Sequence, residues 1–344
     1  MTEHIIHIDG SLGEGGGQVL RTATGLSSLL KIPVRVDNIR ASRPRPGLAA
    51  QHMTGIKALC RLTGGTAEGL SVGSEEVIFR PGGGQKARLD IDVGTAGSVT
   101  LILQGLLVAL ARAPGRVRLT LRGGTDVGWS PPFHYFSRVL CPLLAQMGIP
   151  VKGRLIRTGF YPKGGGEVEV AVTAPGPLQP FRPASPPAAP AIRAFVVASE
   201  DLRKARVAER LLRGARSIFP EIKAEREYRS CLSTGCSIVV TASGGGAVLG
   251  ADSLGEKGTR AEEVGARAAA RLAEELASDV SVDEWASDQI LPFLALAGGE
   301  SSFLARTLTR HAETNMRIIE RFLPARFRVQ EVGGKVRVSC LPKG

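Results

Sequence analysis

The apolar positions of the chain recur in a pattern that predicts alternating strands and helices joined by glycine-rich turns. Residues 5–8 are apolar enough for a short strand, and beyond a glycine-rich turn the apolar residues return at spacings of three and four, as on one helix face. Gly64 stands where a second helix would end. The pattern therefore predicts a strand at 5–8, a helix from about 14 to 30, a strand at 34–39 and a helix at 48–62.

The same succession of turn, helix, strand and helix recurs twice further along the chain. Its second occurrence covers residues 92–147, and its third covers residues 288–331 with a helix at 316–323. A repeat of roughly 80 to 90 residues indicates an internal triplication. We therefore expect three similar α/β units that meet at their loops.

A change of composition interrupts this repeat. Residues 173–190 contain seven prolines and few large apolar residues, which is typical of an extended linker. Beyond it, strands are predicted at 194–198 and 237–241 and helices at 207–219 and 260–276. The predicted fold class is α/β, more fully α+β. A large domain of three repeated units covers 1–182 and 277–344, and a small inserted α/β domain covers 183–276.

The net charge of +12 is carried mostly by arginine, and it indicates what kind of partner the protein binds. A planar guanidinium binds phosphate well, so an anionic partner is predicted and nucleic acid is the first candidate. The alternative is a generally basic surface, and an aromatic content of 5% gives little support for a broad base-stacking platform. With no apolar run of about eighteen residues and no leader pattern, we expect no membrane span and a cytoplasmic protein.

The five cysteines predict neither a metal cage nor a disulfide framework. They are odd in number, scattered and without C-x-x-C spacing. Cys231 and Cys236 could pair if their strands brought them together, but free thiols in a reducing compartment are favoured.

The first glycine-rich turn is a candidate anion site. Four glycines between Gly13 and Gly17 remove the β-carbons where the backbone turns, so main-chain N–H groups can approach phosphate oxygens. A helix that begins near Glu14 would place Glu14, Gln18 and Arg21 on one polar stripe. The pattern is neither a Walker A motif nor GxGxxG, so a simple strand-to-helix turn with solvated polar residues is the alternative.

Two of the five histidines are candidates for chemistry. His311 lies just upstream of a predicted helix N-terminus, whose dipole favours an anion and a neutral imidazole, and neutral imidazole is a potential nucleophile. A histidine that only caps the helix is the alternative. His52 follows an arginine-rich loop and is expected to contact phosphate, unless it is a core histidine. His4, His7 and His134 are expected to be structural or exposed.

Several motifs follow one another along the chain: residues 9–21 (DGSLGEGGGQVLR), 39–52 (IRASRPRPGLAAQH), 94–98 (GTAGS) with Gln104, 123–126 (GGTD), 159–166 (GFYPKGGG), Asp288-Gln289 and 311–315 (HAETN). Together and in this order they resemble the RNA 3'-terminal phosphate cyclase family. The resemblance covers essentially the whole chain outside the insertion. It implies a large domain of three α/β units with a small inserted domain, in agreement with the repeat.

The resemblance also implies an activity, the ATP-dependent conversion of an RNA 3'-terminal phosphate to a 2',3'-cyclic phosphodiester. The reaction would pass through a covalent histidyl-AMP at His311 and an RNA-adenylate, with release of pyrophosphate and AMP. Glu14 would hold a divalent cation, magnesium or manganese. The residues implied at the nucleotide are Gln18, Gln51, Gln104, Pro131, Trp285, Ala286, Ser287, Asp288 and Gln289, and those implied at the phosphates of the RNA end are Arg21, Arg40, Arg43 and His52.

Trp285 departs from the family pattern, in which this position carries tyrosine. Pro131 and Trp285 would flank the adenine, and an indole stacks well but cannot reproduce the contacts of a phenol hydroxyl. Two rival interpretations remain open. A non-catalytic relative would act as a ribosome-assembly or RNA-binding factor, and an enolpyruvyl transferase would share the triplicated architecture; the context of His311 disfavours both.

Overall fold

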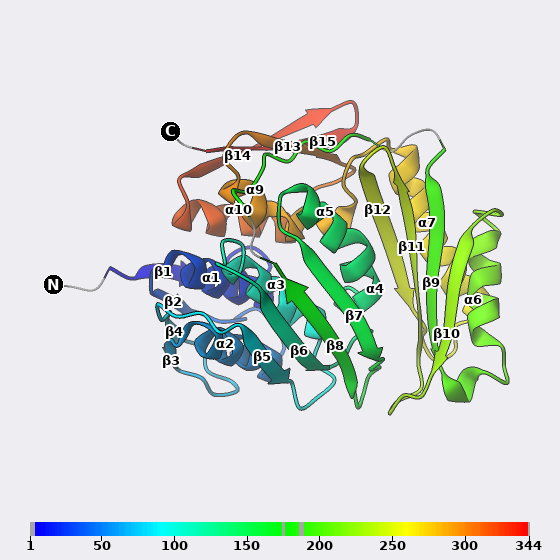
Figure 1. Ribbon diagram of the computed structural model, residues 1–344, viewed down its shortest axis with the longest axis horizontal. Coiled ribbons are helices and arrows are strands. Elements are labelled where there is room, and N and C mark those ends of the chain that lie inside the picture. Colours follow the sequence, from blue (N-terminus) through cyan, green and yellow to red (C-terminus); the bar gives the residue numbers. More distant parts are fainter. Residues whose placement is uncertain (1–3, 174–175, 186–188, 343–344) are drawn as a thin grey trace.

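The computed structural model of the protein describes residues 4–173, 176–185 and 189–342. Its strands form four sheets, three in a large body and one in the segment inserted into it (Figure 1). Within these ranges, no helix combines the length and the apolar character that a membrane crossing needs. The predicted α+β class is confirmed. The proposed linker, residues 173–190, lies partly outside the described residues, at 174–175 and 186–188.

The first unit places two helices against a four-stranded sheet in the order β1-β2-β4-β3. β1 and β2 are parallel, and the other neighbours are antiparallel. Gly64 ends the second helix in the left-handed conformation, as predicted. The elements are β1 (Ile6–Asp9), α1 (Gly17–Leu30), β2 (Val34–Asp37), α2 (Ala50–Thr63), β3 (Thr66–Glu68) and β4 (Val77–Arg80).

The second unit repeats this topology. Its sheet has the order β5-β6-β8-β7, with one parallel pair followed by two antiparallel pairs. The predicted helix at 133–147 is three consecutive segments with a π-helical turn at Phe136–Leu140. The elements are β5 (Arg88–Asp92), α3 (Val99–Ala109), β6 (Val117–Gly123), α4 (Phe133–Tyr135), α5 (Cys141–Gln146), β7 (Val151–Arg157) and β8 (Gly166–Val172).

The third unit has three strands in the order β13-β15-β14, all antiparallel. This order matches the last three strands of the other units, and the first, parallel strand has no counterpart among the described residues. The stretch 288–297, with which the third repeat was expected to begin, is mostly helical. The elements are α8 (Glu284–Gln289), α9 (Leu291–Leu296), β13 (Ser301–Ala305), α10 (Arg310–Phe322), β14 (Ala325–Val332) and β15 (Lys335–Pro342).

The inserted segment forms a separate layer on the right of Figure 1, with two helices covering the outer face of a mixed sheet. It has its own cluster of buried apolar residues, among them Ile238, Leu211 and Leu272. The sequence predicted two of its strands and both helices. The elements are β9 (Ala191–Ser199), a 3-10 turn (Glu200–Leu202), α6 (Val207–Arg216), β10 (Lys223–Arg229), β11 (Cys236–Gly244), β12 (Ala247–Leu254) and α7 (Ala261–Ala277).

Helix α1 packs against α2, α3 and α10 and so joins the three units. Gly25 allows the contact with α3, because a β-carbon there would lie 2.9 Å from the carbonyl oxygen of Gly105. Two predicted helix starts were wrong. α1 begins at Gly17, so Glu14 lies in the preceding loop and off the proposed stripe, and α10 begins at Arg310, so His311 lies inside its first turn. All five cysteines are free thiols.

Candidate active site

Glu14 and His311 face each other although they come from different units. The carboxylate oxygen Oε2 of Glu14 lies 3.2 Å from Nε2 of His311, and a guanidinium nitrogen of Arg43 lies 3.7 Å from the same oxygen. Thr309 caps α10 by accepting a hydrogen bond from the N–H of Ala312 at 3.0 Å. His311 is therefore held at a helix N-terminus, where the helix dipole favours negative charge.

The environment of His311 favours its neutral form. Burial lowers the pKa of the imidazole, and the positive charges of Arg21 and Arg43 lower it further, while Glu14 opposes them. Asn315, four residues further along α10, does not hold the ring of His311. It accepts a hydrogen bond from Thr22 at 2.6 Å and donates one to the carbonyl of Asp288 at 3.0 Å.

His52 lies directly against the start of α1. Burial, together with the charges of Arg21 and Arg40, lowers its pKa to about 3, so it is neutral at pH 7. Its buried Nδ1 has no hydrogen-bond partner in the described part of the chain. Arg40 is anchored by a hydrogen bond to the carbonyl of Gly47 at 2.9 Å. A neutral imidazole with an unused nitrogen, next to arginines, is suited to donate a hydrogen bond to phosphate.

Gly17 makes the room that His52 occupies, since a β-carbon on Gly17 would lie 1.9 Å from Nε2 of His52. We expect Gly17→Ala to displace the imidazole, to cost about 1–3 kcal/mol of stability and to slow turnover roughly 10- to 100-fold. Gly55→Ala, one turn after His52 on α2 with open space around it, is the matched control; it should leave turnover unchanged and, because alanine favours a helix, raise stability by at most about 1 kcal/mol. Urea unfolding and initial rates check this, and an equal effect of both variants would contradict it.

Arg21, Asp288 and Gln18 form a second group beside His311. Burial raises the pKa of Asp288 to about 7 against the pull of Arg21, and it lowers the pKa of Arg21 to about 10. Gln18 donates from Nε2 to Asp288 at 3.3 Å and to the carbonyl of His311 at 3.2 Å. The buried Nε of Arg21 and Oε1 of Gln18 have no hydrogen-bond partner among the described residues.

The predicted nucleotide residues lie close to this group. Gln104 donates to Gln289 at 2.9 Å, and Gln289 donates to the carbonyl of Trp285 at 2.6 Å. Together with Gln18, Arg21 and Asp288, the two glutamines surround a cavity of about 30 Å³, which is room for about one water molecule. The structure thus assembles them as the wall of a small cavity and not as an open nucleotide pocket.

The remaining predicted nucleotide residues are not among those that line this cavity. Pro131 accepts a hydrogen bond through its carbonyl from Thr100 at 2.8 Å, and Gln51 accepts one from the N–H of Ser98 at 2.8 Å. The side chain of Trp285 is exposed, whereas Ala286 and Ser287 are fully buried. The hydroxyl of Ser287 donates to the carbonyl of Glu284 at 2.6 Å, so these two side chains hold α8 in place.

A model of the RNA 3'-terminal phosphate cyclase family matches residues 12–329. The chain belongs to this family. It is 40% identical to a protein of Methanopyrus kandleri over 99% of both chains, and 42% identical to one of Nitrosospira multiformis over 98% of this chain and 96% of that one.

Both relatives carry the name RNA 3'-terminal phosphate cyclase, an enzyme of the ligase class. An EPSP synthase structure from Acinetobacter baumannii aligns with 98% of this chain and 48% of its own at 13% identity and a TM-score of 0.38, a likeness too weak to carry any argument about fold or function.

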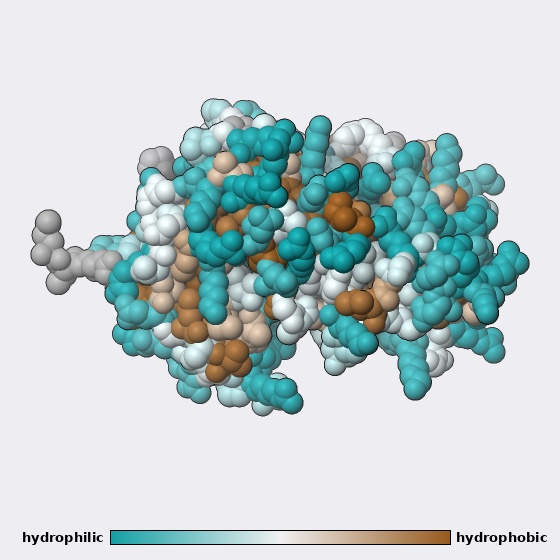
Figure 2. All heavy atoms as spheres, turned by 60° about the horizontal axis from the view of Figure 1, so that its bottom comes forward, coloured by the Kyte–Doolittle hydropathy of each residue, from teal (hydrophilic) through white to brown (hydrophobic). Residues whose placement is uncertain are grey.

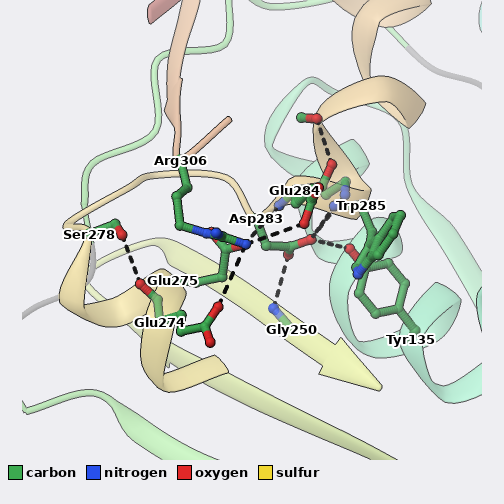
Figure 3. Close-up of polar contacts among 11 residues, drawn as sticks. Tyr135, Gly250, Glu274, Glu275, Ser278, Asp283, Glu284, Trp285 and Arg306 are labelled. Atoms are coloured by element: carbon green, nitrogen blue, oxygen red, sulfur yellow. Dashed lines mark hydrogen bonds and ion pairs between the residues drawn. The ribbon is translucent and has the colours of Figure 1, made fainter. Parts of the chain in front are cut away.

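A buried carboxylate that the sequence did not reveal anchors the α8 segment of this cyclase-family chain (Figure 3). Asp283 caps α8 by accepting hydrogen bonds from the N–H groups of Trp285 at 3.1 Å and Ala286 at 3.0 Å. It also accepts one from the hydroxyl of Tyr135 and one from the N–H of Gly250 at 3.0 Å. Burial raises its pKa to about 6 despite these four donors. The second unit, the inserted sheet and the α8 segment therefore meet at one side chain.

Arg306 reinforces this junction. Its guanidinium lies 3.4 Å from Glu284, 3.6 Å from Glu275 and 3.8 Å from Glu274, where the last two belong to α7 of the insertion (Figure 3). One cation thus bridges carboxylates of α7 and α8. The orientation of the segment that carries Trp285 consequently depends on the inserted domain.

We expect Asp283→Asn to destabilise the protein by about 2–4 kcal/mol, because an amide would turn an N–H₂ group towards buried donors and weaken the helix cap. Glu331→Gln, at an exposed position of β14, is the control and should stay within about 0.5 kcal/mol. Urea unfolding measures both, and equal stabilities would show that the network contributes little.

The side chains around His311 include one carboxylate that could bind a divalent cation. No group of three or more histidine, cysteine, aspartate or glutamate side chains is arranged to hold a metal ion within the described ranges. Magnesium binds with one or two carboxylates and completes its shell with substrate phosphates and water. Glu14, beside His311 and Arg43, supplies one such carboxylate, so the site fits a cation that arrives with a triphosphate and not a resident metal centre.

Proposed function

We propose that this protein uses ATP to convert an RNA 3'-terminal phosphate into a 2',3'-cyclic phosphate, with His311 as the nucleophile that accepts AMP. The observation that carries the proposal is the position of His311, in the first turn of α10 and 3.2 Å from Glu14, where residues of the first and third units meet. Family membership supports the overall reaction, and the neutral imidazole supports the role of this side chain.

The proposed chemistry consists of three transfers at phosphorus. An imidazole nitrogen of His311 attacks the α-phosphorus of ATP, and the bond to the departing pyrophosphate breaks. An oxygen of the RNA 3'-phosphate then attacks the same phosphorus, the P–N bond breaks, and AMP is joined to the RNA end. Finally, the neighbouring 2'-hydroxyl loses its proton and attacks the RNA phosphorus, which closes the ring and releases AMP.

The surrounding side chains are suited to neutralising and orienting the anionic oxygens in these steps, which is the main requirement of phosphoryl transfer. Arg21, Arg40 and Arg43 supply positive charge, and His52 supplies a neutral donor. We infer that Glu14 shares a magnesium or manganese ion with the triphosphate. Held by Glu14, such an ion would stabilise the negative charge that develops on the reacting phosphate.

The nucleotide is proposed to lie with its adenine between Pro131 and Trp285. The cavity beside Asp288 is too small for it, so adenosine would rest on the open side of Gln104 and Gln289. Asp283 and Arg306 would fix the position of α8, the helix that carries Trp285 and Gln289. Trp285 would supply stacking without a hydroxyl contact.

The decisive experiment combines the purified protein with ATP and an oligoribonucleotide that ends in a 3'-phosphate. The expected products are a 2',3'-cyclic end, AMP and pyrophosphate in equal amounts. Binding of RNA with no change at its end would instead support the second candidate, a non-catalytic RNA-binding relative. A 3'-hydroxyl oligonucleotide is the control and should remain unchanged, because it offers no phosphate to activate.

A further inference from the structure

A broad cleft lies between the second unit and the inserted domain, where β6, β7 and β10 end at the lower edge of Figure 1. It holds about 710 Å³, against about 30 Å³ for the cavity beside Asp288. Part of its wall is the motif at residues 159–166, to which the proposed chemistry gives no role. Figure 2 turns this lower side towards the viewer and shows a mainly hydrophilic surface on which hydrophobic residues form separate patches.

The charged residues that line the cleft are mostly cationic, namely Arg122, Arg157, Lys163 and Arg229 against Asp92. Arg122 and Arg157 both contact the carboxylate of Glu167, at 3.2 and 2.8 Å. One carboxylate neutralises only one of the two arginines, so these three side chains together carry one net positive charge. Lys163 is exposed, and its ammonium has no ion pair or hydrogen bond to another described residue. Arg229 is paired with Glu227, so the positive charge offered to a ligand comes mainly from Lys163 and from the excess of arginine over carboxylate around Glu167.

Exposed apolar side chains stand at the same place. Tyr161 is 75% exposed at the start of the loop that carries Lys163, and Leu232, across the cleft in the inserted domain, is 63% exposed. An exposed aromatic ring beside a positively charged groove is the combination that binds single-stranded nucleic acid, because the groove follows the phosphates while a base stacks on the ring. It binds without a preference for sequence.

A continuous series of contacts connects the cleft to the site. Gln51, next to His52, holds the turn at 94–98 through Ser98 at 2.8 Å. The 161–165 loop packs on that turn, since a β-carbon on Gly164 would lie 2.8 Å from the Cα of Ala96. The same loop reaches the inserted domain, where the N–H of Lys163 donates to Ser233 at 3.0 Å.

We propose that this cleft holds the RNA strand on the 5' side of its terminal phosphate, with Lys163 on a backbone phosphate and Tyr161 under a base. The inference rests on the proposed function for the position of the RNA end beside His311. It gives the 159–166 motif a role in holding substrate, and it makes the inserted domain one wall of the RNA path. The reacting phosphate is not contacted from here.

The test compares two RNAs that end in a 3'-phosphate, a dinucleotide and an oligonucleotide of about twelve nucleotides. The double variant Tyr161→Ala, Lys163→Gln should weaken binding of the longer RNA about tenfold or more and leave the dinucleotide unchanged. Lys163→Gln alone should reduce the slope of log affinity against log salt by about 0.7. Arg328→Gln, an exposed arginine of β14, is the matched control and should change neither.

Self-adenylation, measured with labelled ATP and no RNA, keeps this inference separate from the proposed function. The double variant should label as well as the wild type. Equal weakening for both RNAs, or no weakening for either, overturns the cleft as the RNA path. A wild type that fails to label while the length-dependent loss persists overturns the proposed nucleophile and supports the cleft.

Discussion

His311→Ala is expected to abolish covalent labelling of the protein by ATP that carries its label in the α-phosphate. The variant lacks the nitrogen that would bond to phosphorus, so adenylation should fall by about 10⁴-fold or more. In the wild type the label should be lost in acid and stable in alkali, as a phosphoramidate is. The imidazole is partly exposed at the start of α10, so its removal should leave the fold intact.

His7→Ala is the matched control for this experiment. His7 lies on β1, is exposed and contacts Asp37 at 2.6 Å, away from the groups around His311. Its replacement should leave labelling unchanged. Label that persists in His311→Ala, or that maps to a lysine, would contradict the proposed mechanism. It would not change the family to which the chain belongs.

Glu14→Ala is expected to have the second largest effect, a loss of adenylation of roughly 10²- to 10³-fold. Glu14 lies in a loop and contributes little to the core, so the stability of the variant should match that of the wild type. The magnesium concentration that gives half-maximal labelling should rise, and excess magnesium should restore part of the rate. Titrations of both proteins with the ion measure this.

Glu14→Gln separates charge from shape at the same position. An amide keeps the size of the side chain but is a weaker ligand for a hard cation. If charge is what matters, glutamine and alanine should be equally slow. Normal adenylation in both variants would assign Glu14 to the architecture of the loop and remove it from the site.

The longer helices α1, α2, α3, α6 and α7 followed from the sequence because their apolar periodicity is strong, whereas the short helices α8 and α9 did not. Several strands did not. β10 reads Lys-Ala-Glu-Arg-Glu-Tyr-Arg and shows no apolar run, and β7 has only a short alternation that Gly153 interrupts; both lie at the edge of their sheets. Their place is set by pairing with β9 and β8, which local sequence does not encode.

The motifs named the candidate site residues, and their roles stay predictions; the contacts between them could not be predicted from the sequence. Glu14 and His311 were singled out by sequence, yet α1 begins after Glu14, and their contact depends on the packing of α1 against α10. Asp283 gave only a weak signal, an aspartate before the short helix that follows. Its partners Tyr135 and Gly250 are 148 and 33 residues away in the chain, beyond the reach of local patterns.

The contact of α1 with α10 has a consequence for the order of events during synthesis. Gln18 reaches the carbonyl of His311 across 293 residues of chain, so the two halves of the site are made far apart in time. A growing chain that has folded its first two units still lacks His311, the proposed nucleophile, because domains fold as their residues emerge. Under the proposed mechanism, chemical competence would therefore arise late, when α10 docks, and a partly made protein would not consume ATP or modify RNA ends.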